Sequence, residues 1–383
     1  MVDSGIPSEI DAGTVVRPVM LVDAGVYRNY AVYLRWILVG LADTAHASAV
    51  VCPGDIETSS LECPTVEKID YPALRLAIFR TTNQRLLMER LGRFKPTVIH
   101  SFSPGQVGLA AFLAKALDVP FVLTFHGRPH RWDRQRKAIC QAGRIVAPSE
   151  MLVEQAKAVY PSLRERIELV PIGSYVEDEC VCFSRPNLPA SVIAVHPLEE
   201  ADIFEPLLRA VRHLTLDGFE LMLVLMGTGR AEAAIRRSIR SLGLTATVTI
   251  VPPMRPLRTV LAGADVFLHL RDNGLFNAQM LEAMGVGLAV AGVADQTGGL
   301  LTHGQTAVLW EGQNELSIYD GLKQLLGQRD RARRLALNGQ DFLRHQCGVS
   351  CMIDKILKAY ITTQQDYKNP AGQATGKIET IGV

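Results

Sequence analysis

The sequence predicts an α/β protein with two Rossmann-like, doubly wound parallel-sheet domains in series, and three observations lead to this prediction. The chain has 383 residues, whereas a single hydrophobic core stops growing at about 250–300 residues. Short apolar runs rich in β-branched residues alternate with segments of helical spacing, which is typical of a parallel sheet covered on both faces. The alternation lapses once, over residues 175–189, and then starts again.

The first half alternates regularly between strands and helices. Its first apolar run ends at Asp23-Ala24-Gly25, and the second is closed by Pro53-Gly54, as breakers are expected to do. The expected strands are residues 15–22, 47–52, 97–100, 121–125, 143–147 and 169–171, and the expected helices are 30–41, 73–94, 107–117 and 150–159.

The second half repeats the pattern. Asp330 is the expected N-cap of a late helix and Gly339 its stop signal. The expected strands are residues 191–195, 221–226, 248–251, 266–269 and 288–291, and the expected helices are 203–214, 231–242, 279–284, 318–326, 330–338 and 351–362. The chain therefore divides into a first domain (1–178), a linker (179–190), a second domain (191–345) and, at its end, a polar tail (364–383) that is expected to be disordered.

The charge balance, the cysteines and the absence of an Asp-x-Asp motif argue against nucleic-acid binding, disulfide bonds and a metal site. With 40 basic and 39 acidic residues the net charge is +1, so no overall field favours nucleic acid as a partner. The seven cysteines are odd in number and irregular in spacing, and Cys180 and Cys182 are too close together for ordinary zinc ligands, so free cytosolic thiols are expected. No Asp-x-Asp motif is present, and no metal is expected.

The sequence predicts a cytoplasmic location. The first 14 residues are acidic and polar, unlike a secretory signal. The most apolar stretch nearby, residues 30–52, is interrupted by Arg35, Asp43 and His46, so it does not form an unbroken membrane span.

Doubly wound domains bind ligands at the carboxyl ends of their strands. Two such domains fit a nucleotide or sugar enzyme with a cleft between the domains, and they fit a periplasmic-type binding protein equally well. The fold alone does not decide between these classes.

Several local segments carry a family resemblance, in order, over roughly residues 15–362. They include Thr124-Phe125-His126-Gly127 and Leu281-Glu282-Ala283-Met284-Gly285. The full set is 99–104, 109–111, 119–127, 142–150, 166–173 and 281–287. Together they resemble the retaining, nucleotide-sugar-dependent glycosyltransferases of the GT-B type, family 4. The resemblance implies the GT-B fold, a nucleotide-sugar donor as co-substrate, a glycan, lipid or small-molecule acceptor, no other cofactor, and a C-terminal helix (346–363) that crosses back to the first domain.

The resemblance also assigns two charged or titratable site residues. Glu282 matches the family's glutamate that accepts the ribose hydroxyls, a role that suits the two acceptor oxygens of a carboxylate; the alternative is a carboxylate at a helix start that complements the macrodipole. His126 matches the histidine that contacts the donor sugar and is the expected catalytic residue, orienting substrate and stabilising charge. Its alternative is a buried strand-end histidine bonded to backbone.

The remaining donor-binding residues are expected to act through backbone groups or close approach. The N–H groups of Leu275, Phe276 and Asn277 precede a helix and suit phosphate oxygens. Gly25 follows the first strand, where the absence of a side chain lets a phosphate approach. Gly227, in Gly227-Thr228-Gly229, resembles a turn near the nucleotide, although a strand-end turn also explains it. Met254 completes the expected donor site.

Three positions depart from the family pattern. Gly274 stands where the family has a sugar-contacting glutamate, Pro197 where it has an arginine, and Asp202 at or beside its lysine. Such an electrostatic donor is typically worth about 3 kcal/mol in the transition state. Either the site is rebuilt, with His196, Arg255 or Arg271 as substitute cations, or the chain is a non-catalytic relative that binds a glycan or supports a partner enzyme. No local pattern suggests a phosphorylase.

The first domain has a basic character. The residues are Arg75, Arg80, Arg85, Arg90, Arg93, Lys95, Arg128, Arg131, Arg134, Arg136 and Lys137, with Trp132 among them. Family members that act on lipids rest on anionic membranes through such a face, so peripheral membrane contact is one expectation; a solvated helix face is the other. Acceptor contacts are expected in the loops 26–30 and 128–136.

Overall fold

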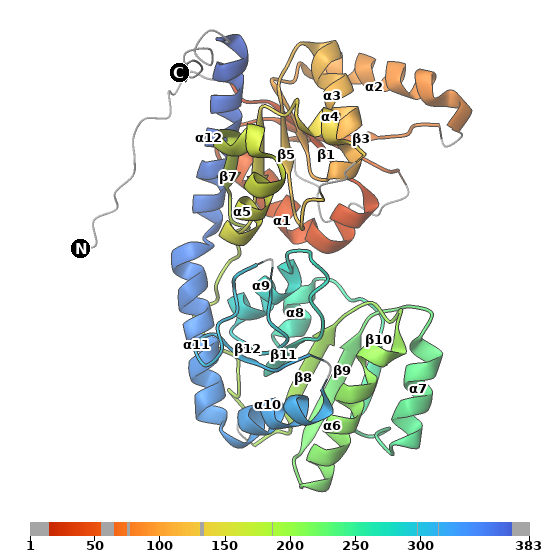
Figure 1. Ribbon diagram of the computed structural model, residues 1–383, viewed down its shortest axis with the longest axis vertical. Coiled ribbons are helices and arrows are strands. Elements are labelled where there is room, and N and C mark those ends of the chain that lie inside the picture. Colours follow the sequence, from red (N-terminus) through yellow and green to blue (C-terminus); the bar gives the residue numbers. More distant parts are fainter. Residues whose placement is uncertain are drawn as a thin grey trace, which may run out of the picture. The chain divides into compact units, whose positions relative to one another are not determined.

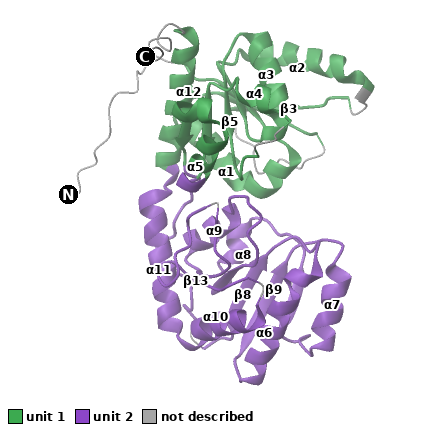
Figure 2. Cartoon of the chain, viewed as in Figure 1, with its two compact units in different colours: residues 1–148, 152–170, 350–383 green, residues 149–151, 171–349 purple. Residues whose placement is uncertain are grey.

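The computed structural model describes residues 15–54, 65–74, 77–130, 134–185, 187–296, 298–312 and 314–369. The chain forms two compact units (Figure 2). Unit 1 comprises Met1–Pro148, Leu152–Val170 and Ser350–Val383, and unit 2 comprises Ser149–Met151 and Pro171–Val349. Residues 179–190, expected as a linker, fall within unit 2. Each unit contains one parallel sheet with helices packed along it (Figure 1), so the prediction of two parallel-sheet α/β domains is confirmed.

Unit 1 has a seven-stranded sheet of order β3-β2-β1-β4-β5-β6-β7, in which every pairing is parallel. This is the doubly wound order, with the switch point between β1 and β4. The strands are β1 (Pro18–Leu21), β2 (Ser48–Cys52), β3 (Val66–Asp70), β4 (Val98–Ser101), β5 (Phe121–Thr124), β6 (Arg144–Ala147) and β7 (Ile167–Leu169). The α-helices are α1 (Ala24–Asp43), α2 (Arg80–Phe94), α3 (Val107–Leu117), α4 (Arg136–Ile139), α5 (Glu150–Val159) and α12 (Val349–Lys368).

Unit 2 has a six-stranded parallel sheet of order β10-β9-β8-β11-β12-β13. The strands are β8 (Ala190–Val195), β9 (Leu221–Met226), β10 (Val248–Val251), β11 (Val266–His269), β12 (Ala289–Gly292) and β13 (Ala307–Leu309). The α-helices are α6 (Glu205–Leu216), α7 (Glu232–Ser241), α8 (Leu257–Leu261), α9 (Ala278–Val286), α10 (Glu315–Gly327) and α11 (Arg329–Gln346). A buried apolar cluster joins the sheet to the helices of one face.

Several helix boundaries differ from the sequence prediction, and those of α1 and α11 have a clear structural cause. Helix α1 begins at Ala24 rather than at residue 30, because Asp23 caps it by accepting a hydrogen bond from the Val26 N–H, and its backbone is kinked at Tyr30. Helix α11 runs on to Gln346, so Gly339 does not stop it, and its N-cap is Gln328 rather than Asp330. Gly339 is buried against Met284 of α9, and this packing outweighs the poor helix propensity of glycine.

Helix α12 is held in unit 1 by polar bonds to four residues, which lie on three separate segments. The Tyr360 hydroxyl and the His100 Nδ1 lie 2.6 Å apart, and His100 Nε2 lies 2.7 Å from Thr124 Oγ1. Arg144 bridges Glu168 and Asp366 at 2.8 and 2.9 Å. The other two bonds are from Gln364 Nε2 to Thr97 Oγ1 (3.1 Å) and from the Tyr367 hydroxyl to Asp118 Oδ1 (2.9 Å). Helix α12 is therefore part of the unit 1 fold.

The C-terminal segment is more ordered than the sequence predicted. Residues 364–368, placed in the disordered tail, form the last turns of α12, and residues 370–383 lie outside the described residues. Six cysteines are free thiols, while Cys63 lies outside the described residues. Among the helices of the described ranges, none is both long and apolar enough to cross a membrane.

Candidate functional site

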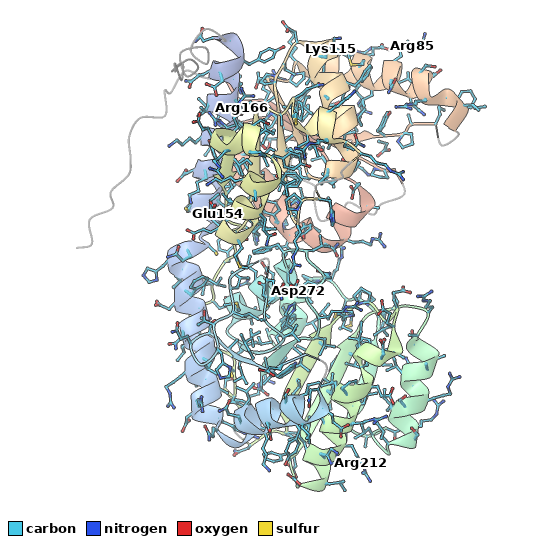
Figure 3. The ribbon with its side chains drawn as sticks, in the orientation of Figure 1. Arg85, Lys115, Glu154, Arg166, Arg212 and Asp272 are labelled. Carbon is cyan, nitrogen blue, oxygen red and sulfur yellow. The ribbon has the colours of Figure 1, made fainter. Side chains whose placement is uncertain are left out.

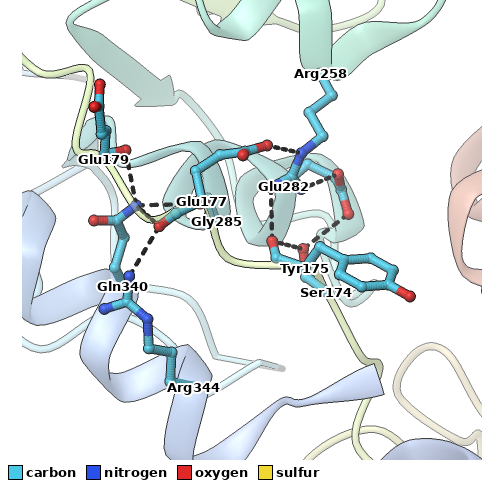
Figure 4. A network of polar contacts seen from close by, with 9 residues as sticks. All are labelled: Ser174, Tyr175, Glu177, Glu179, Arg258, Glu282, Gly285, Gln340 and Arg344. Carbon is cyan, nitrogen blue, oxygen red and sulfur yellow. Dashed lines mark hydrogen bonds and ion pairs between the residues drawn. The ribbon is translucent and has the colours of Figure 1, made fainter. Parts of the chain in front are cut away.

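The predicted ribose-binding carboxylate lies deep in unit 2. Glu282 is only 4% exposed and is the fifth residue of α9, so it does not sit at the helix start and the macrodipole alternative is wrong. Its Oε2 pairs with Arg258 Nη1 at 3.0 Å, and its Oε1 accepts a hydrogen bond from Ser174 Oγ at 3.0 Å (Figure 4). Burial raises the pKa of the Glu282 carboxyl, and the nearby Arg258 opposes that rise.

The N-terminus of α9 is capped by its own sequence. The Asn277 side-chain oxygen accepts from the N–H groups of Gln279 (3.1 Å) and Met280 (3.0 Å). The Leu275 N–H, a predicted phosphate donor, is bonded to Asn273 Oδ1 at 3.0 Å, and Phe276 is buried. A phosphate at this helix end therefore has to replace an internal partner of Leu275.

His269, which no motif of the sequence identified, lies next to this cap. It ends β11 and is 5% exposed, and its Nδ1 lies 3.2 Å from Asn277 Nδ2. Because the Asn277 oxygen is used in capping, its nitrogen is the donor, and His269 Nδ1 is the acceptor. Burial lowers the pKa of His269, so the neutral ring carries its proton on Nε2, which is buried and has no hydrogen-bond partner among the described residues. A sequence signal existed, since a histidine at a strand end is well placed for a ligand.

The first of the three departures from the family pattern has a backbone cause. Gly274 has φ +72°, in the left-handed region, and its N–H bonds to Asp272 Oδ1 at 2.8 Å. Asp272 lies in the loop that follows β11 (Figure 3). The loop shape itself therefore disfavours the glutamate that the family carries at this position.

Restoring that glutamate is expected to destabilise unit 2. Gly274→Glu forces an L-residue into the left-handed region, which costs roughly 1–2 kcal/mol, and urea unfolding measures this loss. Gly274→Asn is the matched control, because asparagine tolerates the same backbone conformation. Equal stability of Gly274→Glu and the wild type is the result that contradicts this explanation.

The other two departures lie in a loop of paired charges. Pro197 and Asp202 are exposed. The candidate substitute cation Arg271 pairs with Glu200 at 2.7 Å, and His196 Nδ1 donates to the Pro197 carbonyl at 2.8 Å. Burial lowers the pKa of His196, so this histidine is neutral. Arg255 is exposed, and the role of each of the three as a substitute cation stays a prediction.

Three further predicted donor-site residues, Gly25, Gly227 and Met254, lie shortly after the ends of strands β1, β9 and β10. A Cβ at Gly227 clashes with the His196 carbonyl oxygen, so close packing of two strand-end loops alone requires this glycine. Gly25 is the second residue of α1, where an added Cβ lies 3.2 Å from Asp23 Oδ1. Met254 is 43% exposed in the loop after β10. Their donor-binding roles stay predictions.

The predicted catalytic histidine lies in unit 1. His126 follows β5 and is 5% exposed, stacked on Tyr30 with 4.1 Å between the ring centroids. Its Nδ1 donates to the Phe102 carbonyl at 3.0 Å, as the alternative of a strand-end histidine bonded to backbone expects. Burial lowers its pKa to about 4, so the ring is neutral and its Nε2 is an acceptor without a hydrogen-bond partner among the described residues. Its catalytic role stays a prediction.

The buried neutral state of His126 makes unit 1 sensitive to acid. Its folded pKa of about 4 lies below its usual 6.5, so the unfolded chain binds the proton more tightly. Stability is full above pH 6.5 and is lost as the pH falls towards 4, at up to about 1.4 kcal/mol per pH unit. Hydrogen exchange of the β4 and β5 amides between pH 6.5 and 5 measures the slope. His126→Gln is expected to reduce it by that amount, and an unchanged slope contradicts the assignment.

Family models match both halves of the chain. The model described as Glycosyltransferase Family 4 matches residues 31–176, and the model described as Glycosyl transferases group 1 matches residues 189–328. A D-inositol 3-phosphate glycosyltransferase of Nocardia farcinica is 29% identical over 270 residues, which cover 64% of this chain and 58% of that relative. The chain thus matches less than two thirds of the relative's length.

Solved structures show the same fold. A glycosyltransferase of Rickettsia africae superposes with a TM-score of 0.76 at 14% identity, covering 92% of this chain and all of that one. The Anabaena protein Alr3699/HepE, in complex with UDP and glucose, has a TM-score of 0.73 at 14% identity, with 91% and 100% covered. Sucrose-phosphate synthase of Thermosynechococcus elongatus has a TM-score of 0.69 at 16% identity, with 91% and 98% covered. These likenesses confirm the predicted GT-B fold.

Proposed function

Because this chain belongs to the family 4-like, group 1 glycosyltransferases of the GT-B fold, we propose that it transfers a sugar from a nucleoside-diphosphate donor to a glycan, lipid or small-molecule acceptor with retention of configuration. The observation that carries the proposal is Glu282. A carboxylate that is only 4% exposed is costly to keep ionised unless it is paired, and Glu282 is held by Arg258 and Ser174. The similar Anabaena protein was solved with UDP and glucose, which supports a nucleotide donor.

The proposed division of labour follows the chemistry of each group. Glu282 accepts the two ribose hydroxyls, and the buried Nε2–H of His269 donates to an oxygen of the diphosphate or the sugar. The neutral His126 orients the donor sugar through its Nε2 lone pair, which has no hydrogen-bond partner among the described residues. The leaving diphosphate gains charge as the glycosidic bond breaks, and preorganised donors such as His269 stabilise that charge. We propose that no metal or further cofactor takes part.

A second candidate function is a non-catalytic relative that binds a glycan or supports a partner enzyme. The observation that favours it is that two groups expected to bind the diphosphate already have partners within the protein. Arg271 is paired with Glu200 and the Leu275 N–H is bonded within its own loop. A protein that binds no diphosphate does not need an unpaired Arg271 or an unbonded Leu275 N–H.

Heat stability in the presence of nucleotides separates the two candidates. A ligand at 100 times its Kd stabilises the folded state by about 2.7 kcal/mol. The transferase proposal predicts a raised Tm with UDP, GDP or ADP, and product NMR then tests whether the anomeric configuration is retained. No shift with any of the three diphosphates favours the non-catalytic relative.

The acceptor and the location are the less constrained parts of the proposal. The six free thiols support a cytoplasmic site of action. Helix α2 supports peripheral membrane contact, because Ile78 is 81% exposed just before it and Arg85 is exposed on it (Figure 3). Arg90 and Arg93 pair with Glu67 and Glu89, which weakens the basic face, while Arg75, Arg131 and Trp132 lie outside the described residues.

Liposome flotation tests the membrane part. We expect binding to vesicles with an anionic lipid to exceed binding to neutral vesicles, and Ile78→Ser to reduce it. Equal flotation with both vesicles contradicts the proposal and leaves α2 as a solvated helix.

A further inference from the structure

Arg258 makes three hydrogen bonds that join two different segments of unit 2 to its own helix. From α8, its Nη1 donates to Glu282 Oε2 (3.0 Å), its Nε to Glu177 Oε1 (2.9 Å) and its Nη2 to the Tyr175 carbonyl (2.7 Å). Figure 4 shows the guanidinium between the segment that carries Tyr175 and Glu177 and the carboxylate of Glu282 on α9. Since a guanidinium is planar and rigid, these bonds fix both its position and that of its partners.

The segment that receives these bonds lies close against α9. A Cβ at Gly285 lies 2.6 Å from the Tyr175 carbonyl oxygen and 3.4 Å from Arg258 Nη1. The same segment is held from α11, because Gln340 Nε2 and Arg344 Nη2 donate to the Glu177 carbonyl at 3.1 and 2.8 Å. The segment that accepts hydrogen bonds from Arg258 is therefore itself held in place by α9 and α11.

The contacts of Glu282 leave acceptor capacity on both of its oxygens. Among the described residues, each oxygen accepts from one donor, Arg258 at Oε2 and Ser174 at Oε1, whereas a carboxylate offers about four lone-pair sites. The Ser174 hydroxyl has a single proton, and the Tyr175 carbonyl, 3.2 Å away, is a second acceptor for it. Ser174 therefore holds the Glu282 carboxylate more weakly than Arg258 does.

The charge balance of the network favours a hydroxyl ligand over an anion. Arg258 is one cation shared by two carboxylates, Glu282 and Glu177. The remaining negative charge repels a phosphate and attracts hydroxyl protons. Without the guanidinium, the buried Glu282 carboxyl gains a proton more readily and loses an acceptor site.

We propose that Arg258 is a positioning residue for sugar-nucleotide binding: it keeps the buried Glu282 carboxylate ionised and fixes its plane, so that both oxygens accept the ribose diol. Arg258 contacts no donor atom in this account and acts only through Glu282. The inference rests on the proposed function, because it takes the nucleoside diphosphate as the ligand.

Calorimetric titration with matched nucleotides tests it. UDP and GDP are each compared with their 2′,3′-dideoxy analogues, and the affinity ratio of each pair measures the diol contribution. The wild type is expected to prefer the ribonucleotide at pH 7. Arg258→Gln is expected to lower that ratio at least about 10-fold at pH 7, with the dideoxy affinity nearly unchanged and with partial recovery of the ratio as the pH rises. Arg236→Gln, which removes an exposed cation of α7 that pairs with Glu232, is the control and keeps the wild-type ratio.

Arg258→Lys keeps the positive charge but loses the planar fork, so the test stands even if Arg258→Gln does not fold. Its ratio is expected between the wild type and Arg258→Gln, with little pH dependence. An unchanged ratio in both Arg258 variants overturns the inference alone, and so does tighter UDP or GDP binding, which shows that Arg258 competes with the ribose for Glu282. A wild type that binds neither diphosphate overturns the proposed function together with the inference.

Discussion

A Tyr360→Ala variant is expected to destabilise unit 1 by about 3–5 kcal/mol, the usual cost of truncating a fully buried aromatic side chain. Tyr360 is 0% exposed, and its hydroxyl is the partner of the buried His100 Nδ1. The loss therefore combines a cavity with an unpaired polar atom. Hydrogen exchange of the β4 and β5 amides measures it, since it reports the opening free energy of those strands alone.

Two further variants separate packing from hydrogen bonding at this position. Tyr360→Phe keeps the ring and removes only the hydroxyl, which costs about 1–3 kcal/mol when the partner stays buried. Tyr367→Phe removes the bond from the same helix to Asp118, but Tyr367 is 47% exposed, so a change within about 0.5 kcal/mol is expected. If Tyr360→Ala loses less than about 1 kcal/mol, α12 does not stabilise the unit 1 sheet.

A Glu282→Ala variant is expected to lose at least about 100-fold in affinity for a nucleoside diphosphate. Two hydrogen bonds to a charged acceptor disappear, each worth about 1.5–3 kcal/mol, and about 1.4 kcal/mol corresponds to a factor of ten. The variant also leaves Arg258 with one carboxylate, Glu177. Titration with UDP and GDP measures the loss.

Glu177→Gln is the matched control for Glu282→Ala. It removes the other carboxylate of Arg258, at 2.9 Å, but Glu177 is exposed. Its nucleotide affinity is expected to stay within about three-fold of the wild type, because exposed ion pairs contribute little. Nucleotide binding by Glu282→Ala at wild-type affinity means that this carboxylate does not contact the ribose.

The sequence was sufficient for the buried central strands and for helices with strong periodicity. The bounds of β9 and β11 agree with the predicted ranges, because buried parallel strands are nearly continuous apolar runs. The bounds of β10, an edge strand with the sequence VTIV, agree as well. Strand β3 (Val66–Asp70) was not predicted, since this edge strand has the polar sequence VEKID and only one of its residues, Ile69, is buried. Strand β13 has three residues and carries too little pattern to detect.

Site residues were predictable only where a short continuous motif identifies them. The short motif around Glu282 identified the carboxylate, but its partner Arg258 lies 24 residues away and Ser174 lies 108 away. No periodicity reports such pairings, because they are set by the packing of α8 and the 174–177 segment on α9. In the same way, the reason for Gly274 became visible only with its backbone angle of +72°.

Donor consumption tests the central claim most directly. The full chain is incubated with UDP-, GDP- and ADP-sugars, and released nucleoside diphosphate is measured with and without a panel of sugar and lipid acceptors. The transferase account predicts release from one nucleotide class, increased by an acceptor and lost in Glu282→Ala. Release from none of the donors, with no binding of UDP, GDP or ADP to the wild type, contradicts it and leaves a glycosyltransferase fold without a nucleotide donor.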